Sequence, residues 1–155
     1  PPLSVAPTEG WGPSLTRKVP MYRITFVLDS FQGQHDRRQS NRQLQILLLA
    51  LVAANEEYLR NHPEAPMLYE SGVRYMEEPP GQEDWQDIPT CLKMRAGDCE
   101  DLACWRVAEL RVRHGVMAKP VFSCKERPNG GMLYHIQVQL PDGRKEDPSR
   151  VLGMR

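Results

Sequence analysis

A long helical pattern of apolar residues places the strongest constraint on how this chain can fold. Ser40 or Asn41 can cap a helix that runs to about Asn61. Within it, apolar side chains recur at helical spacing and form one stripe: Leu44, Leu47, Leu48, Leu51 and Tyr58. A stripe of this kind faces the core of a globular protein. We therefore expect this helix to be the hydrophobic centre of the fold, and we assign it no chemistry.

Segments with the two-residue alternation of β-strands lie on both sides of that helix. The pattern is present at residues 22–28, and again at 117–125 and 132–140. Residues 127–131 join the last two segments, and their Asn-Gly and Gly-Gly pairs favour a hairpin turn. We expect this pair of strands to be antiparallel.

A second helix is expected between the long helix and the hairpin. It runs from Cys99 to about Arg113, and Gly115 is suited to end it. Before it, residues 63–89 hold five prolines and are expected to be mostly loop, with a short strand near residues 73–76. Such a stretch either builds a substrate groove or is a solvated connector. A helix followed by antiparallel strands indicates an α+β fold.

The length of 155 residues predicts one domain, which we place at residues 21–155. Residues 1–20 hold five prolines and no periodic pattern, so they are predicted to be an extended or disordered tail. A formal net charge of zero gives no reason to expect a nucleic acid or an anionic membrane as partner. The sequence does not indicate the oligomeric state.

Location and redox state follow from short features of the chain. No apolar stretch reaches the roughly 18 residues of a membrane span, and no signal peptide is visible, although the chain begins at Pro1. We expect a cytoplasmic or virion-associated protein. The four cysteines form no CxxC pair, which argues against a zinc ribbon or a redox pair. We expect reduced thiols.

Three residues in the order Cys, His, Asp supply what a cysteine acyl-transfer enzyme needs. Cys99 opens the second predicted helix, where unpaired N–H groups and the helix dipole favour a thiolate. Alternation in the last strand turns His135 away from the apolar face, and Asp147 follows a turn at residues 141–144. The other interpretation is an ordinary surface histidine and a structural cysteine.

The acids around Cys99 work against this chemistry. Asp98 is suited to cap the helix, and Glu100 and Asp101 suit its positive end, but the three carboxylates would raise the pKa of the thiol. They need a separate reason, such as capping or a bound cation. The remaining cysteines and histidines are interpreted as packing and solvated residues, respectively: Cys91, Cys104, Cys124, His35, His62 and His114.

The residues around these three positions resemble a known superfamily. Residues 84–89, 95–103 and 140–150 are similar to segments of the transglutaminase-like superfamily, most of all its bacterial transglutaminase-like cysteine proteinase branch and small phage and bacterial members. The resemblance covers roughly residues 65–153. It implies a papain-like core in which the helix that carries the nucleophile packs on an antiparallel sheet.

The resemblance also implies roles for individual residues. Cys99 would be the nucleophile, His135 the general base and acid, and Asp147 the orienting carboxylate. The N–H of Cys99 would be one oxyanion donor, and Trp85 or Gln86 would approach the site and provide a second. No cofactor is required. In some members of the branch acids at the positions of Asp98, Glu100 and Asp101 bind calcium, which the resemblance allows here. In animal-type transglutaminases a tryptophan flanks the histidine. The Tyr134-His135 pair lacks this tryptophan, which argues against protein crosslinking.

The sequence leads to one main functional hypothesis and two alternatives. The main hypothesis is a cysteine-dependent acyl-transfer enzyme acting on protein or peptide amides, as a peptidase, a glutamine deamidase or a transglutaminase. One alternative is a non-catalytic structural or interaction module, such as a virion or assembly component. The other is a calcium-binding regulatory domain. We further expect the apparent pKa of Cys99 to lie well below that of a free thiol.

Overall fold

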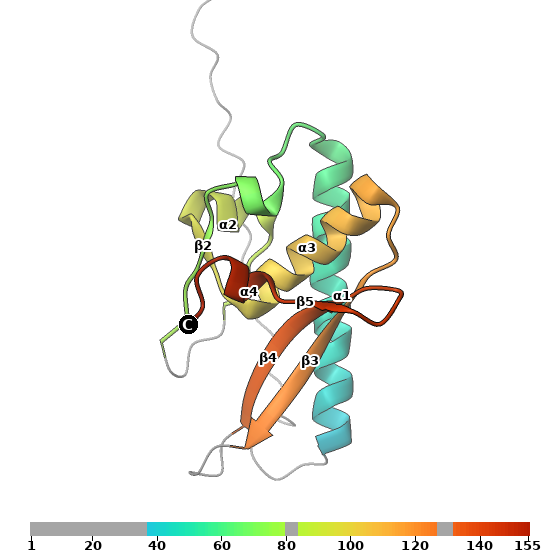
Figure 1. Cartoon of the computed structure of the whole chain (residues 1–155), viewed down its shortest axis with the longest axis vertical. Helices are drawn as coiled ribbons and strands as arrows, with labels where there is room; N and C mark the ends of the chain where they lie inside the picture. The colour runs from blue at the N-terminus through green and yellow to red at the C-terminus, as the bar shows by residue number, and fades with distance from the viewer. Residues whose placement is uncertain (1–36, 80–83, 127–131) are drawn as a thin grey trace, which may run out of the picture.

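A computed structural model describes residues 37–79, 84–126 and 132–155 of the chain (Figure 1). The predicted tail at residues 1–20, the predicted strand at 22–28 and the predicted hairpin turn at 127–131 lie outside the described residues. The described part is a mixed α+β structure with a small antiparallel sheet, as predicted.

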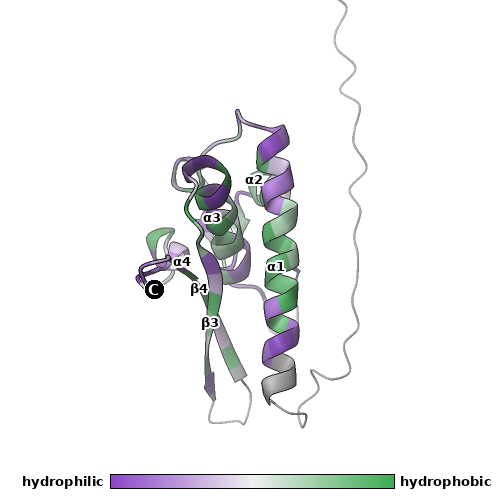
Figure 2. Cartoon of the chain, turned by 90° about the vertical axis from the view of Figure 1, so that its right-hand side faces the viewer, coloured by the Kyte–Doolittle hydropathy of each residue, from purple (hydrophilic) through white to green (hydrophobic). Residues whose placement is uncertain are grey.

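The long predicted helix is α1, Arg37–Asn61. Ser40 and Asn41 lie inside α1, so the prediction that one of them caps it was wrong; Arg37, Arg38 and Gln39 favour helix and extend it upstream. Leu44, Leu48 and Val52 on one side of α1 are buried. Figure 2 shows α1 running alongside the strands, with its hydrophobic stretch in the middle of the helix.

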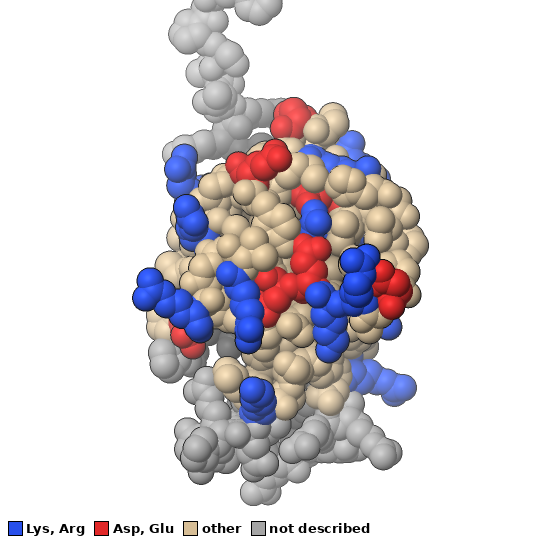
Figure 3. Space-filling view, viewed as in Figure 1, with Lys and Arg blue, Asp and Glu red and all other residues tan. Residues whose placement is uncertain are grey.

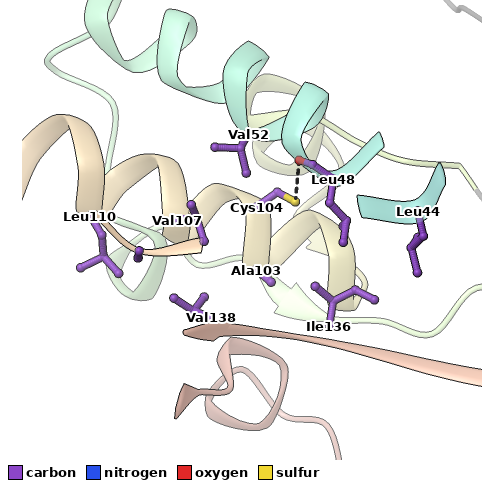
Figure 4. Packing of buried hydrophobic residues seen from close by; sticks show 10 residues of the cluster. Leu44, Leu48, Val52, Ala103, Cys104, Val107, Leu110, Ile136 and Val138 are labelled. Atoms are coloured by element: carbon purple, nitrogen blue, oxygen red, sulfur yellow. Dashed lines mark hydrogen bonds between the residues drawn. The ribbon is translucent and has the colours of Figure 1, made fainter. Parts of the chain in front are cut away.

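The second predicted helix is α3, Cys99–His114, and it packs against both α1 and the sheet. Gly115 ends it with a positive φ of 64°, as predicted. Cys104 lies fully buried between α1 and α3, where its thiol donates to the Leu48 carbonyl at 3.5 Å (Figure 4). The first core cluster joins these two helices to the sheet: Leu44, Leu48, Val52, Ala103, Cys104, Val107, Leu110, Ala118, Ile136 and Val138.

Three strands form the antiparallel sheet, in the order β3-β4-β5. The predicted pair corresponds to β3, Lys119–Glu126, and β4, Met132–Gln139, whose register places Phe122 opposite Ile136. On β4, Ile136 and Val138 are buried against α3, as the alternation predicted. The short β5, Lys145–Glu146, pairs with the end of β4.

The connection from α1 to α3 contains more regular structure than predicted. It holds a 3-10 turn, η2 (Leu68–Glu70), then β1 (Arg74–Tyr75), α2 (Ile88–Met94) and β2 (Ala96–Gly97), and β1 pairs in parallel with β2. The short strand near residues 73–76 is confirmed. The helix α2 was not predicted, although Asp87 caps it by accepting from the Thr90 N–H at 3.1 Å.

A second core cluster lies under this connection and under α4, Pro148–Val151. Its buried members come from α1, the connection, α3 and the C-terminal segment: Leu59, Ala65, Leu68, Val73, Ile88, Cys91, Leu102, Trp105, Ala108 and Leu152. The helix α3 therefore has core on two sides. Among the described residues, no helix is both long enough and apolar enough to cross a membrane.

Candidate active site

Cys99 is the first residue of α3, and a reciprocal capping box fixes the backbone around it. Asp98 is the N-cap, its side chain accepts from the N–H of Asp101, and its own N–H donates to Asp101 Oδ2 at 3.2 Å. The prediction that Asp98 caps this helix is confirmed. The capping box explains part of the acidic pattern without any ligand.

Gly97 allows β2 to approach the start of α3 closely. A Cβ atom at this position would lie 3.1 Å from Cβ of Asp101 and 3.2 Å from the sulfur of Cys91. Both neighbours are buried, so neither has room to move aside. Glycine is therefore the residue that lets the chain turn directly into the helix that begins with Cys99.

The imidazole of His135 is held by Asp147. Nε2 of His135 lies 2.8 Å from Oδ2 of Asp147, and the same oxygen accepts from the side-chain amide of Gln137 at 3.2 Å. Asp147 directly follows β5 and is the N-cap of α4, where its Oδ1 accepts from the N–H of Arg150 at 3.3 Å. Burial opposes ionisation of Asp147, but the hydrogen bonds from His135, Arg150 and Gln137 prevail and lower its pKa.

Cys99 lies beside β4, next to Ile136, the residue that follows His135. Its sulfur faces the backbone N–H of Ile136, and its side chain packs on the first core cluster. The thiol donates to Oε2 of Glu100 at 3.3 Å. Within the described part of the chain, no hydrogen bond joins this sulfur to the His135 ring. The structure thus brings His135 to Asp147 and brings Cys99 to the strand that carries His135.

The pKa of the Cys99 thiol is raised in this arrangement. Burial is the largest cause, the negative charges of Glu100 and Asp98 add to it, and the Ile136 N–H opposes it. The expectation of a thiol pKa well below the free value was therefore wrong. Cys99 does lie at a helix N-terminus, as predicted. Desolvation and the neighbouring acids raise its pKa by more than the helix dipole lowers it.

The acids themselves share one buried site. Burial and the charge of Asp98 raise the pKa of Glu100, and they raise the pKa of Asp101 to about 8. Both oxygens of Asp101 accept backbone N–H groups, from Gln86 at 2.6 Å and from Asp98. In residues 37–79, 84–126 and 132–155, no three His, Cys, Asp or Glu side chains are arranged to hold a metal ion. The calcium role of Asp98, Glu100 and Asp101 stays a prediction.

Trp85 and Gln86 both lie near the start of α3. Trp85 is half-buried and packs on the same core cluster as Cys99. The backbone N–H of Gln86 donates to Asp101, so in this arrangement it does not point to an oxyanion at Cys99. The side-chain Oε1 of Gln86 is buried and has no hydrogen-bond partner among the described residues. The oxyanion role of Trp85 or Gln86 stays a prediction.

Two residues near the site were missed by the sequence analysis. Tyr75 on β1 has a pKa raised to about 12, first by burial and then by the charge that Cys99 carries once it is ionised. The pairing of β1 with β2 brings Tyr75 to the site, and a pairing of such short strands has no signal in the local sequence. Arg150, whose Nε lies 3.4 Å from Asp147 Oδ2, also touches the site. On the face shown in Figure 3, Lys and Arg side chains surround a smaller group of Asp and Glu side chains.

Of the other cysteines and histidines, Cys91, Cys104, His62 and His114 lie where the sequence placed them. All four cysteines carry free thiols; Cys91 and Cys104 are buried, and Cys124 is half-buried. His62 and His114 are exposed, and His62 stacks on Tyr58 with ring centroids 4.5 Å apart. His35 lies outside the described residues.

Comparison of the chain with protein-family models, with curated proteins and with solved structures gave no match.

Proposed function

We propose that this protein is a cysteine-dependent acyl-transfer enzyme of the transglutaminase-like type, with a papain-like core and a Cys99, His135, Asp147 triad. The observation that supports this best is the 2.8 Å contact of His135 with Asp147 on the strand beside Cys99. A helix that begins with the nucleophile and packs on that strand is the expected architecture. The substrate class is a protein or peptide amide.

The contact with Asp147 assigns the two ring nitrogens of His135 different tasks. Asp147 engages Nε2, and a carboxylate there favours the tautomer in which Nε2 carries the hydrogen. Nδ1 is then the nitrogen that accepts a proton. Because Asp147 stays ionised, it also stabilises the imidazolium that forms when the thiol is deprotonated.

The proposed reaction moves one acyl group and one proton at a time. Nδ1 of His135 takes the Cys99 proton as the sulfur attacks the amide carbon, and a tetrahedral oxyanion forms. The same proton then passes to the leaving amine or ammonia, the C–N bond breaks, and a thioester remains on Cys99. Water or an amine attacks the thioester, its proton goes to His135, and Cys99 leaves as the thiolate and regains the proton. Water as acceptor gives proteolysis or deamidation, and it is the acceptor we favour.

The raised pKa of Cys99 decides how the thiol is activated. A buried thiol beside Glu100 is neutral in the resting site, so His135 deprotonates it during the attack. The resting site is thus a thiol and an imidazole rather than a preformed ion pair. This explains why the thiol donates to Glu100 before substrate binds.

The proposed function is tested by trapping the acyl-enzyme. The purified protein is mixed with p-nitrophenyl acetate, quenched in acid and digested, and the peptides are examined by mass spectrometry. We expect an acetyl group on the peptide that contains Cys99, and no burst of p-nitrophenolate from the Cys99→Ser variant. Cys124→Ser is the matched control, because Cys124 is the other half-buried thiol. Acetylation of Cys124 at the rate of Cys99 would count against the proposal.

Exchange of Glu100 for glutamine is expected to ease ionisation of Cys99. The change removes the carboxyl group whose Oε2 lies 3.3 Å from the sulfur and keeps the size of the side chain. The charge of Glu100, where it is ionised, raises the pKa of the thiol, so its removal relieves part of the upward shift while burial keeps the rest. Iodoacetamide alkylation of Cys99 at pH 9 and pH 10 reports the fraction of thiolate, and we expect a faster rate in Glu100→Gln. Asp142→Asn, which removes an exposed acid elsewhere, should leave the rate unchanged. An unchanged rate in Glu100→Gln would show that Glu100 does not contribute to the raised pKa.

The two alternative functions predict different results. A calcium-binding regulatory domain would be stabilised by calcium even as the Cys99→Ser variant, which thermal unfolding with and without calcium measures. A non-catalytic module would show no acyl group on Cys99 with any ester or peptide. For an active protein, ammonia release, amine incorporation and peptide cleavage, assayed on one glutamine-containing peptide, separate deamidation, transamidation and proteolysis.

A further inference from the structure

We propose that Arg106 is a positioning residue of the candidate site: by binding Glu146 it fixes the adjacent Asp147 relative to the helix that carries Cys99. The inference rests on the proposed function for its consequence, but the contacts that support it stand by themselves. Arg106 lies on α3, about two helical turns after Cys99. Glu146 is the last residue of β5 and directly precedes Asp147.

Arg106 contacts Glu146 at two points. Its Nε lies 2.7 Å from Oε1 of Glu146, and its Nη2 lies 3.5 Å from Oε2. A two-point contact between a guanidinium and a carboxylate fixes orientation as well as distance. The side chains are 17% and 24% exposed, so solvent screens this pair less than an ion pair on the open surface.

The alternation of side chains along β5 carries this constraint to Asp147. Glu146 pairs with Val138, and Val138 is buried against α3, so Glu146 lies on the α3 side of the sheet. Asp147 comes next and turns to the other side, where it meets His135. Since β5 has only two residues, its own ladder holds Asp147 weakly. The contact of Arg106 with Glu146 ties this short strand to α3.

The orientation of Arg106 is itself fixed from two other directions. Its Nη1 bonds Glu109, which is fully buried and also accepts from the N–H of Leu68 at 2.7 Å. The ring of Tyr69 lies 5.0 Å below the guanidinium, and the Tyr69 hydroxyl bonds Glu146. We call Arg106 and Glu146, with Glu109 and Tyr69, the arginine brace.

The experiment measures the acylation rate of Cys99 by p-nitrophenyl acetate in Arg106→Gln and in Glu146→Gln. Each variant breaks the contact between Arg106 and Glu146 from a different side. Glu146→Gln keeps the buried Arg106–Glu109 pair, so it still tests the proposal if Arg106→Gln fails to fold. Misplacement of Asp147 is expected to lower the rate about 10- to 100-fold with KM unchanged. Arg106→Lys, which keeps the charge, should recover part of the loss. Arg113→Gln is the control, because Arg113 is a half-buried arginine of α3 that binds Ala65 rather than β5.

A purely structural role would give a different pattern. If Arg106 acts through Asp147, Arg106→Gln lowers the rate in the wild-type background and changes little when Asp147 is already alanine. An equal loss in both backgrounds, or a loss equal to that of Arg113→Gln, would overturn the proposal.

A second measurement does not depend on activity. Proton NMR detects the ring N–H of His135 in its hydrogen bond to Asp147, assigned by its loss in Asp147→Ala. We expect the signal in the wild type and in Arg113→Gln, and its loss or broadening in Glu146→Gln. If the wild type forms no acyl-enzyme, the proposed function fails and this signal still decides whether the brace holds Asp147. A signal unchanged in both Glu146→Gln and Arg106→Gln would refute the brace.

Discussion

The exchange His135→Ala is expected to lower the rate of Cys99 acylation about a thousandfold. The imidazole is the group that accepts the thiol proton, and general-base assistance of this kind contributes roughly 10²- to 10⁴-fold. The loss should be large here because burial and Glu100 raise the pKa of Cys99, so little thiolate is present without the base. Stopped-flow release of p-nitrophenolate at pH 7 measures the rate.

Two further variants identify which property of His135 matters. Asp147→Asn is expected to lower the rate as well, although its Oδ1 can still accept from the Arg150 N–H and cap α4. His62→Ala, which removes an exposed imidazole, should leave the rate unchanged. If His135→Ala acylates at the wild-type rate, another group takes the thiol proton and the triad does not operate.

Replacement of Trp105 by alanine is expected to destabilise the protein by about 3–5 kcal/mol, the usual range for removal of a buried tryptophan. Trp105 is fully buried in the second core cluster, between α3 and the connection that holds η2 and α2. Its removal leaves a cavity that rigid neighbours on several elements cannot fill. Urea unfolding followed by circular dichroism measures the free energy of unfolding.

Trp105→Phe is the informative companion variant. The indole Nε1 has no hydrogen-bond partner within the described residues, so phenylalanine gives up packing volume but no hydrogen bond. We expect it to cost clearly less than the alanine variant. Equal losses for the two would mean that the indole N–H makes a contact that this arrangement lacks.

The elements that could be predicted from the sequence are those specified by local pattern. The long helix, the helix from Cys99 to Gly115 and the strands that contain His135 and Phe122 all follow from periodicity and a C-terminal glycine. The same alternation correctly turned His135 away from the core and left Ile136 buried. These features need no knowledge of distant neighbours.

The features that escaped prediction depend on distant neighbours or on burial. The pairing of β1 with β2 involves two residues on each strand, and together with the hydrogen bond from the Tyr75 N–H to Leu152 it brings Tyr75 toward the site. The pKa of Cys99 could not be read from its place at a helix N-terminus, because the deciding cause is how much the fold buries the sulfur. The start of α1 was placed too late, since two cap-forming residues lay inside a helix that begins at Arg37.

The carboxylate of Asp147 has consequences for how this sequence can change. One oxygen holds the His135 ring and the other caps α4, whose following residue, Leu152, is buried and accepts from the N–H of Tyr75. A mutation at position 147 therefore damages the chemistry and the packing of the C-terminal segment at once. Homologues that lose catalysis by drift should keep Asp, Asn or Ser at this position for the helix cap, so a retained polar residue there is no sign of retained activity. The His135 side chain makes no second hydrogen bond to the described residues, so we expect the loss of catalysis to show first as substitution of position 135.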